Sequence, residues 1–207
     1  MERLILSPVG ESNETQAQYA GFVIRAGARL TDVVFLYVVG FVAAIVTVFL
    51  LAIGEAITGN QLVARLSQAG VLSWWNVVLG MLSVCGYHTI CEGFHGSTLG
   101  KLVFGLVTLN EDLTPCKLKG ATIRNLVFIF LDGLAACIPA LLVMNRSPEK
   151  QRIGDQWGKT VVVRRSSVPS TSRRPGWRFV PAFVGASAFS FVIALMNLMR
   201  ATLGGTP

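Results

Sequence analysis

The chain has 207 residues, of which 52% are hydrophobic and only 14% are charged, and its mean hydropathy is +0.58. Soluble domains have nearly as many apolar residues but about 25% charged ones. The composition therefore disfavours a soluble enzyme, a disordered protein and a disulfide scaffold. The formal net charge of +7 would suggest nucleic acid as the partner of a soluble protein. In a membrane protein it more often reflects basic loops held against anionic lipid head groups, so we expect an integral membrane protein.

Four apolar stretches are long enough to cross a bilayer, which takes about 20 helical residues. They comprise residues 33–53, 71–91, 126–144 and 179–199. The third stretch differs from the others because it contains Asp132 and because Gly133 and Pro139 weaken helix interiors. Residues 1–20 lack the apolar core of a signal peptide, so the first stretch is expected to be an uncleaved anchor.

The distribution of lysine and arginine bears on how the chain crosses the membrane. The segments before, between and after the four stretches carry 3, 1, 4, 9 and 1 of these residues. Four full spans would place 8 on one side and 10 on the other, whereas short cytoplasmic loops normally hold a clear excess. If residues 126–144 enter and leave on the same side, the split becomes 16 against 2.

These counts predict an all-α integral membrane protein with three full transmembrane helices and a re-entrant or broken third stretch. Four full spans are the alternative. We expect a multi-pass protein of the plasma or inner membrane with its N-terminus in the cytoplasm. The strand-like segments 102–109 and 160–163 predict a small cytoplasmic-side β element. The expected organisation is a polar tail (1–18), a membrane domain (19–165), a basic linker (166–178) and a further transmembrane helix with a short tail (179–207).

Charged residues at the edge of an apolar stretch need a partner. Asp32 begins the first stretch and shares a helical face with Arg25 and Arg29. One of these arginines, or a distant one, is a candidate partner for the carboxylate. The alternative is an interfacial cap flanked by snorkelling arginines.

Other ionisable residues lie at or inside the apolar stretches. Asp132 shares a helical face with Arg124 and Phe128, and an acid at this depth is either functional or structural. His88 and Glu92 stand four residues apart at the end of the second stretch. They could form a proton-handling pair, because histidine titrates near neutral pH, or they could cap the helix at the interface.

Two further motifs lie between the apolar stretches. Asp155 stands among many arginines, where a carboxylate commonly accepts several guanidinium groups. The segment 96–101 resembles a phosphate-binding loop only superficially, because the spacing of the nucleotide-binding pattern is absent. No catalytic motif is visible, and the cysteines and histidines lack the spacing of a metal site. We therefore expect no enzyme, no cofactor, no metal and no nucleic-acid partner.

Several of these segments together resemble the RDD family of small membrane proteins, which is named for one arginine and two aspartates. The similar segments are 20–25 with Ala28 and Asp32, 96–101 with 105–106, 124–125, and 151–155 with 158–163. The resemblance implies that Arg25, Asp32 and Asp155 are the signature residues. The accompanying motif residues are Gly96, Thr98, Gly100, Lys101, Arg152 and Gly154. The chain departs from the family pattern at Val23, Ile24 and Arg29, and residues 179–199 lie beyond the family region.

The resemblance implies a role in transport without naming a substrate, and it also allows an accessory subunit of a membrane complex. We expect Arg25, Asp32 and Asp155 to form one ionic cluster in which Arg25 pairs with Asp155. One hypothesis is a transporter of small solutes or ions that uses this cluster and the polar residues of the apolar stretches. The other is a non-catalytic scaffold that binds a partner protein or anionic lipid through its basic inner face. The expected partners are bilayer lipids and either a second copy of the chain or another membrane protein.

Overall fold

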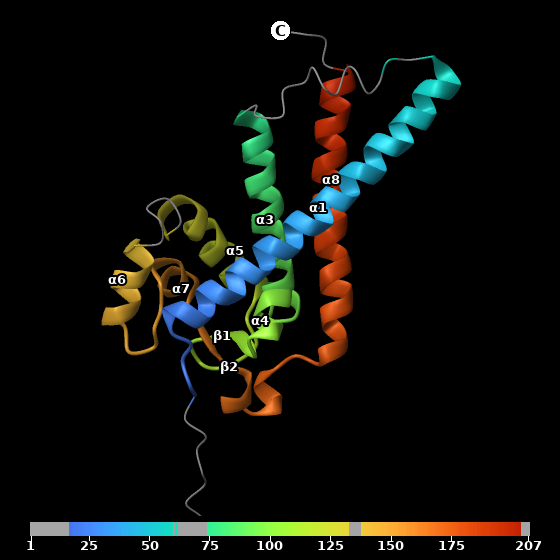
Figure 1. Ribbon diagram of the computed structural model, residues 1–207. Coiled ribbons are helices and arrows are strands. Elements are labelled where there is room, and N and C mark those ends of the chain that lie inside the picture. Colours follow the sequence, from blue (N-terminus) through green and yellow to red (C-terminus); the bar gives the residue numbers. More distant parts are fainter. Residues whose placement is uncertain (1–16, 60, 62–73, 133–137, 204–207) are drawn as a thin grey trace, which may run out of the picture.

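The computed structural model describes residues 17–59, 61, 74–132 and 138–203. In chain order, the elements are α1 (Phe22–Thr58), α3 (Trp74–Phe94), α4 (Leu99–Val103), β1 (Leu106–Asn110), α5 (Leu118–Val127), the π-helix η1 (Phe128–Asp132), α6 (Ile138–Arg146), α7 (Ile153–Gly158), β2 (Thr160–Arg164), the 3-10 turns η2 (Arg165–Ser167), η3 (Ser170–Ser172) and η4 (Gly176–Arg178), and α8 (Phe179–Leu203). Figure 1 shows that α1, α3 and α8 extend away from the short elements α4 to α7 and the two strands, which together we call the body.

Three segments are long and apolar enough to cross a membrane, namely Phe22–Thr58, Asn76–Phe94 and Ser170–Met196. At 1.5 Å per residue, the 37 residues of α1 extend about 55 Å, which exceeds the roughly 30 Å of a hydrocarbon core. Its uncharged part begins after Asp32 and continues as far as Glu55. The charged first turns of α1 therefore have room to lie outside the hydrocarbon.

Helices α3 and α8 lie side by side (Figure 1). Their contact is built on buried Tyr87, Cys91 and Ala186. Gly86 lets the ring of Phe189 rest against the backbone of α3, because a side chain at this position would collide with that ring. The outward flanks of α1, α3 and α8 present exposed apolar side chains, which is the arrangement expected of helices that face lipid.

The third apolar stretch is divided among several elements. Helix α5 continues into the π-helix η1, residues 133–137 lie outside the described residues, and α6 follows. Both ends of this region adjoin the sheet. Leu109 of β1 forms a bridge to Pro115, just before α5, and the side chain of Gln151, just before α7, donates to the carbonyl of Thr160 in β2 at 3.0 Å.

The expected small sheet is present. Strands β1 and β2 pair antiparallel, with Leu106 opposite Arg164 and Asn110 opposite Thr160. The strand expected at 102–109 begins later, because residues 99–103 form α4. The side chain of Thr98 accepts the backbone N–H of Lys101 and so caps this helix.

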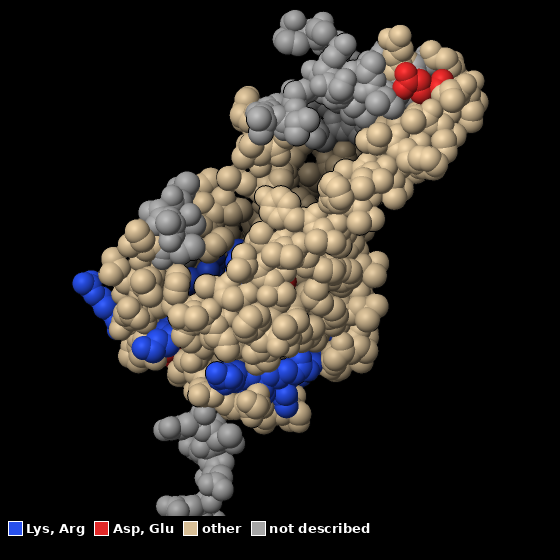
Figure 2. All heavy atoms as spheres, viewed as in Figure 1, with Lys and Arg blue, Asp and Glu red and all other residues tan. Residues whose placement is uncertain are grey.

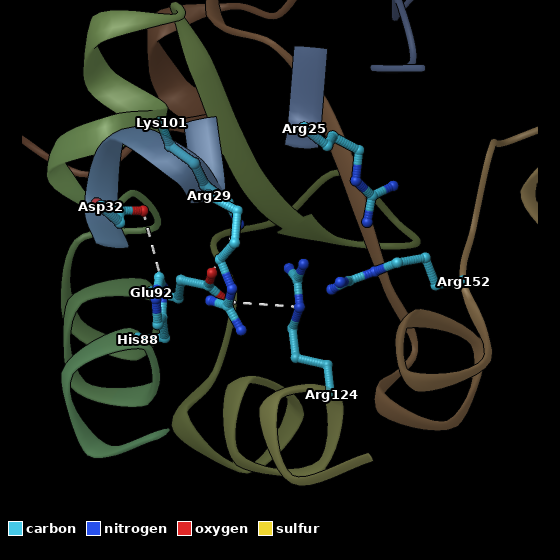
Figure 3. A pocket seen from close by; sticks show the side chains of 8 residues that line it. All are labelled: Arg25, Arg29, Asp32, His88, Glu92, Lys101, Arg124 and Arg152. Carbon is cyan, nitrogen blue, oxygen red and sulfur yellow. Dashed lines mark hydrogen bonds and ion pairs between the residues drawn. The ribbon is translucent and has the colours of Figure 1, made fainter. Parts of the chain in front are cut away.

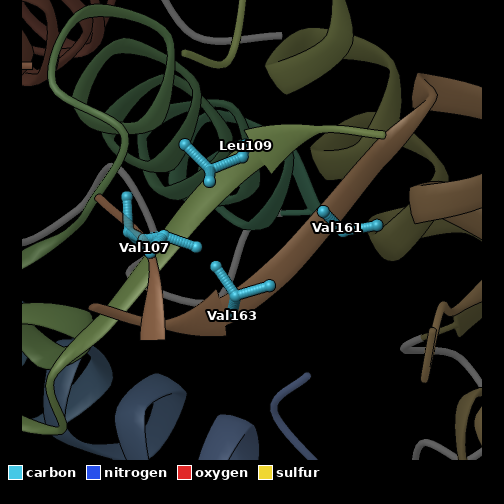
Figure 4. Packing of buried hydrophobic residues seen from close by; sticks show 5 residues of the cluster. Val107, Leu109, Val161 and Val163 are labelled. Carbon is cyan, nitrogen blue, oxygen red and sulfur yellow. The ribbon is translucent and has the colours of Figure 1, made fainter. Parts of the chain in front are cut away.

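Alternate side chains of the sheet enter two separate buried clusters, as a period of two requires. One cluster holds Val107, Leu109, Val161, Val163 and Val168, of which Figure 4 labels the four strand residues. The other holds Ala20, Ala28, Leu106 and Val162 and lies against α1. In addition, the backbone N–H of Ala20 donates to the carbonyl of Val162 at 2.8 Å. The sheet therefore fixes the start of α1 against the body.

The basic linker expected at 166–178 contains most of the three 3-10 turns that precede α8. Arg174 donates to the carbonyl of Cys116 at 2.8 Å and to the carbonyl of Gly93 near the end of α3. This segment is therefore attached to the body at the base of α3.

Candidate functional site

Ionisable side chains from α1, α3, α4 and α5, and from Arg152 just before α7, converge on one small cavity at the start of α1. The cavity has a volume of about 30 Å³. Its lining residues are Arg25, Arg29, Asp32, His88, Glu92, Lys101, Arg124 and Arg152, all labelled in Figure 3. Asp155 contacts three of them. We call these nine residues the polar cluster.

Asp155 is the anionic centre of one half of the polar cluster. Its buried carboxylate pairs with Arg25, with Arg124 Nη2 at 3.1 Å and with Arg152 Nη2 at 3.5 Å. It also accepts the backbone N–H of Arg152, the residue that caps the start of α7, at 3.2 Å. Burial alone would raise the pKa of Asp155, but the positive charges of Arg25, Arg124 and Arg152 together hold it well below its ordinary value. The expected pairing of Arg25 with Asp155 is present and joins α1 to α7.

Glu92 links α3 to α4 and α5. Its fully buried carboxylate accepts from Lys101 Nζ at 2.7 Å and from Asn125 Nδ2 at 3.2 Å, and Arg124 Nε lies 3.4 Å away. Lys101 also donates to the hydroxyl of Thr108 at 2.7 Å. Burial and the positive charge of Arg124 lower the pKa of Lys101 to about 7, against the opposite effect of the Glu92 carboxylate. The interfacial cap that we considered for Glu92 is thus replaced by a buried ionic link.

Asp32 is held in a different way. Its carboxylate accepts from the hydroxyl of Thr98 at 2.6 Å, from the backbone N–H of Gly100 at 2.7 Å and from the hydroxyl of Tyr87 at 3.1 Å. His88 Nδ1 lies 3.9 Å from the carboxylate, and neither ring nitrogen of His88 has a hydrogen-bond partner among the described residues. Neutral donors from α3 and α4 therefore satisfy Asp32.

The partner expected for Asp32 was therefore wrong. The carboxylate is not ion-paired with Arg25 or Arg29 in the described part of the chain, although all three residues line the cavity. The single ionic cluster expected for Arg25, Asp32 and Asp155 is instead two separate carboxylate sites: Asp32 lines the cavity, and Asp155 pairs with three of the arginines that line it. The physical reason is that the cap of α4 brings a hydroxyl and a backbone N–H to Asp32, which leaves Arg25 to Asp155.

Two glycines allow the helices of the site to approach each other closely. A side chain at Gly100 would collide with the carbonyl of Ala28 and would lie 2.9 Å from the Asp32 carboxyl carbon. A side chain at Gly154 would lie 2.7 Å from the carbonyl of Arg124. The motif glycines at these positions thus place α4 against α1, and α7 against α5.

The motif segment 96–101 has a structural role in this protein. Gly96 adopts a positive φ of 92°, a conformation that glycine reaches without steric cost, and its carbonyl accepts the backbone N–H of Thr108. The backbone N–H of Gly100 is occupied by the chain's own carboxylate at Asp32. The segment therefore connects α4 to α1 and to β1.

Arg29 differs from the other cations of the cluster. Its guanidinium lies over the ring of Phe128, with 4.3 Å between the guanidinium carbon and the ring centroid. Arg152 lies over the same ring at 5.0 Å. Within the described residues, no carboxylate is ion-paired with Arg29, whereas Arg152 reaches Asp155. Phe128 belongs to η1, so the third apolar stretch contributes directly to the site.

One expected site residue has no described place in the cluster, and two hydroxyl partners of its members were not foreseen. Asp132 is the last residue of η1, and its side chain lies outside the described residues. Tyr87 and Thr108 were missed as partners, because a hydroxyl group in an apolar segment carries no signal of what it will bind. Among the described residues there is no group of three or more histidine, cysteine or acidic residues that could hold a metal ion.

A comparison with protein families shows which family the chain belongs to. A family model described as the RDD family matches residues 19–159, a region that begins before α1 and ends after α7. The chain belongs to the RDD family. No curated protein and no solved structure matches it. The matched region of this RDD protein contains every residue of the polar cluster, and α8 lies beyond it.

Proposed function

We propose that this RDD protein is a membrane transport protein in which the polar cluster handles small ions or solutes. The observation that supports the proposal is the cavity lined by eight ionisable side chains in a chain with three membrane-capable helices. Burying so many charges is costly unless they are paired or serve a function. The small volume of the cavity favours a single ion or a very small solute over a larger substrate.

We further propose that α1, α3 and α8 cross the membrane and that residues 118–146 form a re-entrant hairpin on the cytoplasmic side. In support, both ends of the hairpin region adjoin the sheet. Figure 2 shows lysine and arginine gathered around the body, whereas on the far part of α1 the only coloured charged atoms in this view are acidic ones near its tip. Basic residues favour the cytoplasmic side, which would place the body and the N-terminus in the cytoplasm of a cell membrane.

The proposed sidedness is tested by labelling single cysteines in an otherwise cysteine-free chain with a membrane-impermeant maleimide. Thr58→Cys, at the far end of α1, should be labelled in intact cells. Ser166→Cys, beside the sheet, should be labelled only after the membrane is permeabilised. Labelling of both positions in intact cells, or the reverse pattern, would contradict the proposed topology.

The transport proposal is tested by flux in proteoliposomes. Gradients of sodium, potassium, chloride or phosphate are imposed one at a time while an internal dye and a voltage-sensitive dye are followed. His88→Gln is the informative variant, because it removes a titratable group from the cavity without removing a hydrogen bond between described residues. We expect at least a tenfold loss of flux, with Arg146→Gln, an exposed arginine at the end of α6, unchanged. If the folded wild-type protein moves none of these ions, the transport proposal fails.

A second candidate function is a membrane scaffold, and the far half of α1 favours it. Residues 38–50 of α1 are all exposed, and Phe41, Ile45 and Val48 line a shallow apolar groove on this helix. A second copy of the chain or another membrane protein could cover this flank. Ala44→Trp would fill the groove, so the scaffold hypothesis predicts a smaller assembly for this variant by native mass spectrometry in detergent. An unchanged monomer that retains flux would exclude it.

A further inference from the structure

The polar cluster carries more positive than negative charge among its described members. Five cationic groups (Arg25, Arg29, Lys101, Arg124, Arg152) face three carboxylates (Asp32, Glu92, Asp155), which leaves a formal excess of two positive charges with Lys101 protonated. The Asp32 carboxylate accepts from neutral donors and is ion-paired with none of the arginines in the described part of the chain. In a partly desolvated site, cations without a counter-charge are unfavourable. The charge excess therefore calls for an anion.

The geometry indicates where that anion would lie. Figure 3 shows the guanidinium groups of Arg25, Arg29, Arg124 and Arg152 directed toward a common space. Arg29 and Arg152 are both held over the ring of Phe128, so the site holds two like charges near each other. Guanidinium groups match the oxygens of a phosphate group with paired N–H donors.

We propose that the cavity between these arginines binds the anionic oxygens of one phosphate group. Its volume of about 30 Å³ has room for about two water-sized groups, so it can take up oxygens of the phosphate group, while anything bonded to that group has to remain outside the cavity. The phosphate group can belong to free inorganic phosphate or to the head group of an anionic lipid. The position of the cavity at the charged start of α1, before its apolar part, is compatible with either source.

This inference deepens the proposed function by naming the ion class at the same cluster, and its biological role rests on that function. Binding, however, can be measured without flux. Saturable binding with no transport would refute the transport proposal and leave the anion site intact. Transport of a cation with no phosphate binding would support the transport proposal and refute the anion site.

The experiment uses the full chain purified in a zwitterionic detergent and phosphate-free buffer. Binding is measured by calorimetry and by the shift in Tm, first with inorganic phosphate and then with phosphatidylglycerol added to mixed micelles, with phosphatidylcholine as the neutral comparison. The test variant is Arg29→Gln, because Arg29 has no ion-paired carboxylate among the described residues and its loss should leave the rest of the network in place. Arg146→Gln is the matched control.

We expect saturable binding by the wild type and by the control, and at least tenfold weaker binding by Arg29→Gln with an unchanged ligand-free Tm. A response to inorganic phosphate identifies the free ion as a ligand, and a response to phosphatidylglycerol alone identifies the head group. If Arg29→Gln does not fold, Arg29→Lys replaces it. This variant keeps the charge but loses the planar pair of donors, so the proposal again requires weaker binding.

Two results would overturn the proposal. One is the absence of saturable binding by the wild type in both titrations, and the other is wild-type affinity in the Arg29 variant. Asp132→Asn sharpens the first result, because Asp132 follows Phe128 by one helical turn along η1. If only Asp132→Asn binds phosphate, the chain supplies its own counter-charge and the cavity is not an anion site.

Discussion

The two aspartates of the polar cluster are buried within one small region, yet their surroundings are opposite in kind. Asp32 accepts from two hydroxyls and one backbone N–H. Asp155 accepts from three guanidinium groups. We therefore expect the negative charge to contribute less to stability at Asp32 than at Asp155. Asp32 fixes the position of α4 on α1, and Asp155 neutralises the arginines that join α1, α5 and α7.

The largest expected effect is that of Asp155→Asn. The amide keeps the size of the side chain but leaves Arg25, Arg124 and Arg152 without their shared anion. Breaking a buried ion pair costs about 3–5 kcal/mol, and thermal unfolding in detergent should reveal a loss of that order. Asp112→Asn, at an exposed position in the turn after β1, is the matched control. A stability equal to that of the control would show that Asp155 is not the anionic centre of the cluster.

The next effect tests the close approach of α4 to α1. Gly100→Ala places a methyl group against the carbonyl of Ala28 and against Asp32, and overpacking of this kind costs about 1–3 kcal/mol. Gly40→Ala is the control within α1, where a methyl group meets nothing within 4 Å. Alanine should stabilise that helix by up to about 1 kcal/mol. The same substitution should therefore have opposite signs in the two variants, and equal Tm shifts would contradict this packing.

Asp32→Asn should have a smaller effect than Asp155→Asn, and this difference is the direct test of the comparison. Asparagine retains one oxygen for the donors at Gly100 and Tyr87, and the hydroxyl of Thr98 can accept from the new amide by rotating its hydrogen. We expect a loss of about 1 kcal/mol in unfolding free energy, typical of one net hydrogen bond. A loss as large as that of Asp155→Asn would mean that the charge of Asp32 matters as much as its hydrogen bonds.

The smallest expected effect is the change in stability with pH over the acidic range in which the protein can be measured. Because the folded-state pKa of Asp155 is depressed, its contribution to stability is present above the ordinary carboxyl pKa of about 4 and is lost as the pH falls through the folded-state value. The wild type should lose stability below about pH 4, and Asp155→Asn should lose less over the same interval. Parallel curves of Tm against pH for the two proteins would contradict this assignment.

Much of the architecture was predictable from the sequence, because it depends on patterns of charge and hydrophobicity. The three long apolar helices, the small sheet and the pairing of Arg25 with Asp155 follow from such patterns or from the family resemblance. The partners of Asp32 did not follow, because Tyr87 and Gly100 are 55 and 68 residues away. A backbone N–H has no residue-specific signal, so only the folded cap of α4 reveals it. The same cap explains why β1 begins later than its β-branched residues suggested.

Helix α1 is one uninterrupted rod from the cavity to its far end, where Gly59 terminates it in a left-handed conformation. Its apolar part and its charged start cannot therefore reorient independently. A bilayer that is thinner or thicker than the apolar part favours a different tilt of the helix. That tilt is resisted by the sheet, to which the chain just before α1 is bonded. If α1 crosses the bilayer as proposed, membrane thickness should therefore affect the geometry of Arg25, Arg29 and Asp32, and the acyl-chain length of the reconstituting lipid should be treated as a variable in every measurement on this site.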